Sequence, residues 1–239
     1  MFGVGASSAR LEADRKTQLN LRRMATLTLA ATDDACVVNL ASIQEKVVEI
    51  LTATAASSPS SMTRAEVFML LRALVLKTST VHLAPLWPII SSELYDALSS
   101  LLPDQDTQIY NAISIVQACK LLDALLTTAP DDFQLREWLF ITDTIDAVYR
   151  PASWTPTALI DRLAEDLGSK AQVRPGARPS LASIHAKDIS KEDLVNSLLP
   201  FLRQLSINAF ESTYRMEGVD WKGCYKDLLR DLFDAGTLV

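Results

Sequence analysis

The sequence predicts an all-α protein, a HEAT/armadillo-like α-solenoid of about nine helices in antiparallel pairs. The composition is that of a globular chain, with 49% hydrophobic and 22% charged residues. Apolar residues recur three and four positions apart, which is the spacing of one helix face. None of the seven glycines lies between Gly5 and Gly168. Because tight hairpins need glycine for positive φ, this gap counts against β-sheet folds.

The period of the expected helical pairs supports a solenoid. Each pair takes about 40 residues, as the repeats of HEAT and armadillo arrays do. The pairs share no repeat motif, so the repeat lies in the length of the helical pairs and not in their amino-acid sequence. A compact, irregular helical domain is the alternative fold.

The N-terminal helical pair occupies residues 1–56, with helices expected over 8–32 and 35–56. The apolar residues that mark these two helices are Leu11, Leu19, Met24 and Leu27 in the first, and Val38, Ile43, Val47, Ile50 and Leu51 in the second. The Asp33–Asp34 pair separates the helices and can cap the second one. The serine- and proline-rich stretch 57–61 is expected to be a flexible linker.

Central helical repeats are expected over 63–168. Thr63 and Glu66 form a capping box that opens a helix over 64–78. The apolar run of this helix is broken by Arg72 and is too short to span a bilayer.

Prolines punctuate the rest of the central region. Pro85 and Pro88 kink or restart a helix that continues over 89–102, because proline removes a backbone donor. The next helix covers 107–128 and ends before Pro130. Its expected inward residues are Ile109, Ile113, Val116, Leu121 and Leu125.

The segment 133–149 is apolar nearly all round, so we expect it to form a central helix covered by its neighbours. The last helix of the central region is expected to start at Thr155-Pro156 and to stop at Gly168.

A basic flexible loop is expected over 169–190. Its cations, Lys170, Arg174, Arg178 and Lys187, are candidates for binding an anionic lipid headgroup. A solvated linker that touches nothing is the alternative. Nucleic acid is not expected as a partner, because no aromatic side chain lies between Lys170 and Lys191 to stack on a base.

The C-terminal helical pair occupies 191–239. Its first helix spans 191–214 with a kink near Pro200, and its stripe of Leu194, Leu198, Phe201 and Leu205 can pair within the chain or between two chains as a homodimer. Its second helix spans 219–234 and carries Trp221, Tyr225, Leu228 and Leu232 at helical spacing. We expect it to pack on the preceding helix as a terminal cap, since its mixed charge argues against lipid binding.

The sequence contains no pattern that supports catalysis, a cofactor or a metal site. The formal net charge of −6 argues against broad attraction to nucleic acid or acidic membranes. The three cysteines are far apart, and Cys119 fits a small buried side chain better than a reactive thiolate. Asp143 and Asp146 lie three positions apart, which suits a salt-bridged face better than paired catalytic carboxylates. We therefore do not expect an enzyme.

Several long segments resemble one known family. They are VFMLLRALVL (67–76), LAPLWP (83–88), QACKLLDALL (117–126), DFQLREWLFITDTIDAVYRP (132–151) and LLPFLRQLSINAFESTY (198–214). Together they resemble the C-terminal region of the Dopey family, over roughly 63–214. The first ten residues lack the basic and then apolar order of a signal peptide, so we expect a piece of a longer cytosolic protein.

The resemblance implies a function but no catalytic motif. Dopey proteins are large, attach peripherally to Golgi and endosomal membranes, and act in endosome-to-Golgi traffic with a Sec7-related scaffold and a phospholipid flippase. The chain is then expected to be a non-catalytic scaffold module that works by protein–protein contacts. A membrane-attachment module that binds phosphoinositide or other acidic lipid, and a homodimerisation unit of a helical adaptor, are the alternatives.

Candidate partner-binding residues follow from their side-chain type and not from the family pattern. They are Trp87, Trp138, Tyr149, Arg150 and Trp154. Large aromatic side chains and arginines dominate the energetics of protein interfaces. Packing in the protein core is the alternative role for each aromatic residue.

Overall fold

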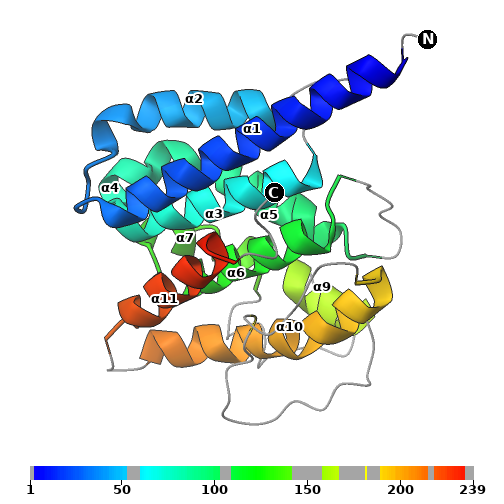
Figure 1. Cartoon of the computed structure of the whole chain (residues 1–239). Coiled ribbons are helices and arrows are strands. Elements are labelled where there is room, and N and C mark those ends of the chain that lie inside the picture. Colours follow the sequence, from blue (N-terminus) through cyan, green and yellow to red (C-terminus); the bar gives the residue numbers. More distant parts are fainter. Residues whose placement is uncertain are drawn as a thin grey trace.

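The computed structural model describes residues 3–52, 60–102, 109–141, 158–166, 181, 189–214 and 218–234. These residues form helices and turns without a strand, so the all-α class is confirmed. The α-helices are α1 (Gly3–Ala30), α2 (Leu40–Leu51), α3 (Ser61–Lys77), α4 (Thr80–Leu83), α5 (Trp87–Ser99), α6 (Ala112–Thr128), α7 (Asp131–Gln134), α9 (Leu159–Asp166), α10 (Lys191–Tyr214) and α11 (Trp221–Leu232) (Figure 1). Short 3₁₀ turns are η1 (Val37–Asn39), η2 (Ala84–Leu86) and η3 (Glu137–Leu139).

Helix α3 is the centre of the fold. Every side chain from Thr63 to Leu76 is buried. Helices α1, α6 and α11 pack directly against it (Figure 1). A helix that is buried on all sides must satisfy its charged residues within the protein, and α3 contains three of them in this stretch.

The prediction of a central helix over 133–149 is wrong for residues 133–141, the part that the structure describes. The chain forms the single turn α7 and then switches to the 3₁₀ turn η3, with the Leu139 amide donating to the Arg136 carbonyl. Phe133 and Phe140 point into the core, whereas Leu135 and Trp138 are 73% and 66% exposed. The all-round apolar pattern therefore reflects one inward and one outward set of residues.

The start of α3 differs from the expected capping box. Ser60 is the N-cap, and its Oγ accepts a hydrogen bond from the Thr63 amide at 3.3 Å. The carboxylate of Glu66 is instead bound by Arg22 of α1. Glu66 thus links two helices and does not close the end of its own helix.

The Asp33–Asp34 turn also has a different role from the expected cap of α2. Asp34 has a φ of 62°, and its Oδ1 accepts a hydrogen bond from the Ser79 amide at 2.7 Å. Asp33 pairs with Lys77 at 2.6 Å. The turn between α1 and α2 is therefore fastened to the junction of α3 and α4. Val38, expected to point inward, is 91% exposed in η1.

The proline-rich segment restarts the helix as expected, because α4 passes through η2 and then into α5. Helix α6 begins at Ala112, later than the expected 107. Its N-cap Asn111 and Ser114 form a reciprocal capping box, in which each backbone amide donates to the other side chain at 2.9 Å. Ile109 lies before the helix and is exposed.

We expect Asn111→Ala to lower the free energy of unfolding by about 1 kcal/mol, because it leaves the first amides of α6 without a side-chain acceptor. Asn111→Asp keeps the acceptor and should stay close to the unmodified chain. Urea denaturation measures both. Equal loss of stability in the two variants would contradict the capping role.

The helices from α1 to α10 pack in an order compatible with solenoid-like stacking: α1 on α3, α3 on α6, and α10 on α6 and α9. Helix α10 contains Pro200, and Leu194, Leu198, Phe201 and Leu205 are buried within this chain. Helix α11 does not pack mainly on α10, so the expected terminal cap on the preceding helix is wrong. It returns to contact α3 and α1 (Figure 1).

Candidate functional site

Three buried ion pairs join α3 to three different helices. Two N–H groups of Arg22 on α1 donate to the two oxygens of Glu66, with Nε to Oε2 at 3.0 Å. Arg64 pairs with Glu93 of α5 at 2.6 Å, and Arg72 pairs with Asp231 of α11 at 2.5 Å. The charges of α3 thus determine which side of it faces each neighbour.

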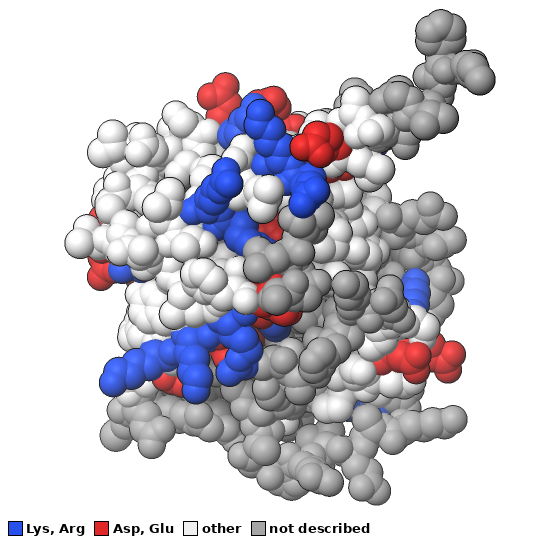
Figure 2. All heavy atoms as spheres, viewed as in Figure 1, with Lys and Arg blue, Asp and Glu red and all other residues white. Residues whose placement is uncertain are grey.

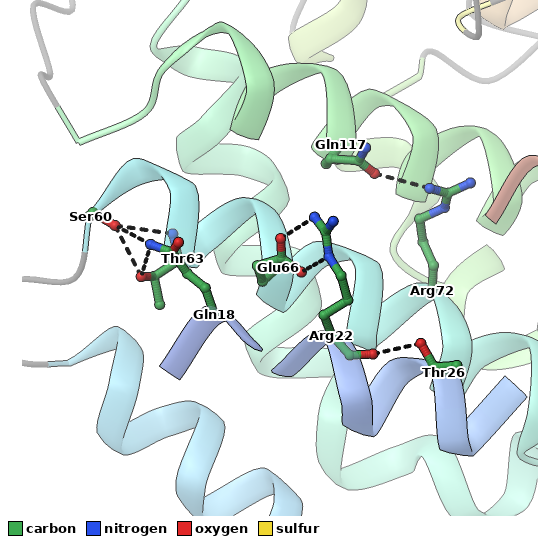
Figure 3. A network of polar contacts seen from close by, with 8 residues as sticks. All are labelled: Gln18, Arg22, Thr26, Ser60, Thr63, Glu66, Arg72 and Gln117. Carbon is green, nitrogen blue, oxygen red and sulfur yellow. Dashed lines mark hydrogen bonds and ion pairs between the residues drawn. The ribbon is translucent and has the colours of Figure 1, made fainter. Parts of the chain in front are cut away.

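Helix α1 presents a polar face to α3. Gln18 Nε2 donates to Ser60 Oγ at 3.0 Å and to Thr63 Oγ1 at 3.2 Å, one turn before the pair between Arg22 and Glu66 (Figure 3). The buried face of α1 consists of Gln18, Leu21, Arg22, Ala25 and Thr28. Leu11 and Leu27, on which the sequence prediction relied, are exposed. The predicted apolar set is therefore correct only in part, since Met24 is partly buried and packs against the core.

A second polar cluster lies between α3, α5 and the start of α6. Tyr110 donates through its hydroxyl to Glu93 at 3.0 Å, and the Arg64 guanidinium lies 5.2 Å from the centre of the Tyr110 ring. Burial, together with the negative charge of Glu93, raises the pKa of Tyr110. The tyrosine therefore stays a neutral donor that holds α5 and α6 together.

The third cluster holds α11, and we name it the α11 seat: Leu76, Arg72, Gln117 and Lys120. Asp231 accepts from Arg72 and from Lys120 at 2.5 Å each. Gln117 Oε1 accepts a further hydrogen bond from Arg72 at 3.0 Å, as Figure 3 shows. The Tyr225 hydroxyl donates to the Leu76 carbonyl at 3.0 Å. The seat therefore combines two cations with a backbone acceptor.

The electrostatics of the seat favour the ionised form of Asp231. Burial by itself would raise the pKa of this carboxyl, but the charges of Arg72 and Lys120 outweigh burial and hold the pKa below its ordinary value. A carboxyl whose pKa is lowered by folding stabilises the fold above its unfolded pKa. That contribution is lost as the pH falls through the folded value.

We therefore expect Asp231→Asn to lower the free energy of unfolding at pH 7 but to lose this effect in acid. The difference from the unmodified chain should be about 3 kcal/mol at pH 7 and should shrink as the pH falls below about 4. Urea denaturation at a series of pH values measures it. A difference that stays constant down to pH 3 would count against the ion pairs of Asp231.

The predicted partner-binding residues lie in unlike environments. Trp87 is 1% exposed, its Nε1 donates to Asp132 at 3.0 Å, and its ring centre lies 6.2 Å from that of Phe133. It belongs to the core, the alternative role for this residue. Trp138 is exposed, and its binding role stays a prediction. Tyr149, Arg150 and Trp154 lie outside the described residues, as do Asp143 and Asp146.

The predicted lipid-binding cations Lys170, Arg174, Arg178 and Lys187 also lie outside the described residues. A different basic surface is seen on the described helices. Lys and Arg side chains form two groups on one face, one over α1 and one over α11 (Figure 2). The exposed Lys and Arg residues of these two helices are Arg10, Arg15, Lys16 and Arg23 on α1, and Lys222, Lys226 and Arg230 on α11.

The basic face of α11 was not expected, because Asp231 was counted together with the exposed acids Asp220, Asp227 and Asp234. Asp231 is buried in the α11 seat, and Asp220 caps the helix by accepting from the Gly223 amide at 2.9 Å. The spacing of Lys222, Lys226 and Arg230, each four residues from the next, was the available signal.

Within the described part of the chain, no helix is long and apolar enough to cross a membrane. No group of three or more metal-ligating side chains is found among those same residues. Cys119 is fully buried, and burial raises the pKa of its thiol, in agreement with the small buried side chain expected there.

Comparison with known proteins gives the family. The model of the family described as DOP1 C-terminal matches residues 1–215. The chain belongs to the DOP1 (Dopey) family. This confirms the resemblance seen in the sequence and extends it to the N-terminal helices. The match ends before α11, which lies beyond residue 215.

Two DOP1 relatives are similar along nearly the whole chain. Protein dop1 of Emericella nidulans is 48% identical over 251 residues, which cover 100% of this chain and 14% of that protein. Protein DOP1 of Saccharomyces cerevisiae is 29% identical over 249 residues, which cover 97% of this chain and 13% of that protein. The chain thus spans about one seventh of the length of these DOP1 proteins. No solved structure matches it.

Proposed function

We propose that the chain is a non-catalytic scaffold module of a Dopey-type protein, which acts in endosome-to-Golgi membrane traffic through protein–protein contacts. Membership of the DOP1 family is the observation that carries this proposal. According to this proposal, the module lies on the cytoplasmic side of Golgi and endosomal membranes as part of a peripheral protein. Its partners are the Sec7-related trans-Golgi scaffold and the phospholipid flippase implied by the family.

The structure supports a contact role in two ways. The body is cross-linked by ion pairs between α3 and its neighbours, which suits a rigid platform for binding. Leu135, which follows α7, and Trp138 of η3 are exposed and lie close together in the chain. An exposed tryptophan is a typical anchor of a protein interface.

Affinity capture from cell extract tests the proposal. The chain is used as bait, and the Sec7-related scaffold and the flippase are detected with specific antibodies. We expect the unmodified chain to recover at least one of them and Trp138→Ala to recover less. Val81→Ala, which also alters an exposed apolar side chain, is the matched control. Recovery of neither partner would contradict the proposal.

Anionic-lipid binding is a second candidate, favoured by the exposed cations of α1 and α11 (Figure 2). Each cation near a charged bilayer contributes about 1 kcal/mol. Flotation with vesicles that contain phosphatidylserine or a phosphoinositide tests it. Lys222→Ser with Lys226→Ser should reduce the bound fraction, whereas Lys46→Ser on α2 should not. Equal flotation of all three proteins would contradict this candidate.

A further inference from the structure

The outward side of α11 carries two large apolar side chains that the fold leaves in solvent. Leu229 is 44% exposed and Phe233, the C-cap residue, is 66% exposed. On the inward side, Leu228, Asp231 and Leu232 are buried, and α11 packs on α3. Because the inward side holds the helix in place, Leu229 and Phe233 are free to contact something outside the chain.

Two lysines lie on the same face of α11 as these apolar side chains. Leu229 comes seven residues after Lys222, and Phe233 comes seven residues after Lys226. Since about 3.6 residues make one turn, residues seven apart lie on one face of a helix, two turns from each other. All four side chains are exposed. The apolar stem of a lysine can lie along such a face while its ammonium group reaches outward.

The acids of α11 do not share this face. The helix itself contains Asp227 and Asp231, and Asp231 is buried in the α11 seat. Asp227 comes two residues before Leu229, and residues two apart on a helix do not face each other. Asp220 and Asp234 lie just outside the two ends of the helix. The mixed charge of α11 is thus divided between its flanks, and its exposed apolar face is basic.

Helix α1, which packs against α11, presents a similar face. Lys16 and Arg23 are exposed and lie seven residues apart, and Leu27, four residues after Arg23, is exposed as well. Lys and Arg side chains lie over both helices on the face of the molecule seen in Figure 2. Salt screens exposed charges beyond about 10 Å. This local group of cations can therefore attract an anionic surface, although the net charge of the chain is −6.

We propose that α11 is an interfacial helix that attaches the protein to an anionic lipid bilayer. The helix stays seated on α3, inserts Leu229 and Phe233 between the headgroups, and binds the lipid anions through Lys222 and Lys226. Interfacial helices combine Phe and Leu with Lys and Arg in this way. An acidic protein fits the face less well, because lysine is depleted in protein interfaces. The proposal rests on the anionic-lipid candidate above and adds to it the insertion of apolar side chains.

Flotation of the full chain with vesicles of phosphatidylcholine and phosphatidylserine tests the insertion. Leu229→Ser with Phe233→Ser removes the apolar side chains and keeps every charge. We expect the partition coefficient of this variant to fall about tenfold, because two apolar side chains no longer leave water. Val38→Ser with Val81→Ser changes two exposed apolar side chains outside α1 and α11, and should alter the partition by less than about twofold. Equal partition of the two double variants would overturn the proposal.

Contact with the acyl chains is measured with vesicles that contain brominated phosphatidylcholine, because bromine quenches tryptophan fluorescence only at short range. Phe233→Trp should increase the fraction of the fluorescence that these vesicles quench, whereas Leu135→Trp, at an exposed position in another segment, should not. Flotation without added quenching in Phe233→Trp would leave the lipid candidate in place and overturn the insertion. Absence of flotation of the unmodified chain would contradict both. Flotation that the serine changes in α11 leave intact and that polyglutamate abolishes would identify an acidic protein as the partner and overturn the proposal.

Discussion

Replacing Glu66 with alanine is expected to lower the free energy of unfolding by about 3–5 kcal/mol. Arg22 and Glu66 have side chains only 8% and 4% exposed. Without the carboxylate, the buried Arg22 guanidinium loses the counter-charge that binds it between α1 and α3. Urea denaturation followed by circular dichroism measures the loss.

Two matched variants separate this cause from general damage to the core. The double variant Arg22→Met with Glu66→Leu removes both charges, and we expect it to be much more stable than Glu66→Ala, because paired removal leaves no orphaned ion. Glu49→Ala breaks the exposed Lys46 pair, in which both side chains are more than 60% exposed, and should cost less than about 0.5 kcal/mol. A double variant as unstable as Glu66→Ala would argue against the ion-pair explanation.

Trp87→Ala is expected to cost about 3–5 kcal/mol, as truncation of a large buried aromatic side chain typically does. The change removes a ring packed near Phe133 and leaves Asp132 without its indole donor. Trp138→Ala, at an exposed tryptophan, should change stability by no more than about 0.5 kcal/mol.

Thermal or urea unfolding of the two tryptophan variants measures the contrast directly. Trp87→Phe serves as an intermediate control, because it keeps an aromatic ring and loses only the indole N–H and part of the volume. Similar losses for Trp87→Ala and Trp138→Ala would contradict the buried and exposed positions assigned to them.

The sequence predicted the all-α class, the family and the main helices because these depend on local signals. Apolar spacing marked the helices, and Pro85 and Pro88 marked the restart before α5. The packing of the helices was less predictable. Both 64–78 and 133–149 look apolar all round, and only the positions of their tertiary partners decide that the first is central and that the second is interrupted.

The candidate sites were harder to predict, because a charged residue in a sequence is normally expected to lie on the protein surface. Arg72 was seen as an interruption of an apolar run, and its partner Asp231 lies 159 residues away in the chain. Glu66 fitted a local capping pattern and instead binds Arg22, 44 residues earlier. Long-range pairs of this kind have no local signature in a single sequence.

The charges on α3 have a consequence for the uniqueness of the fold. Leucine-rich helices can slide past one another by a turn and still bury similar apolar area. Such a shift along α3 would move Glu66, Arg64 and Arg72 away from their three partners at once and strand each ion in an apolar medium. Shifted packings are therefore higher in free energy. The ion pairs favour one alignment of the four helices over others that would bury a similar apolar area.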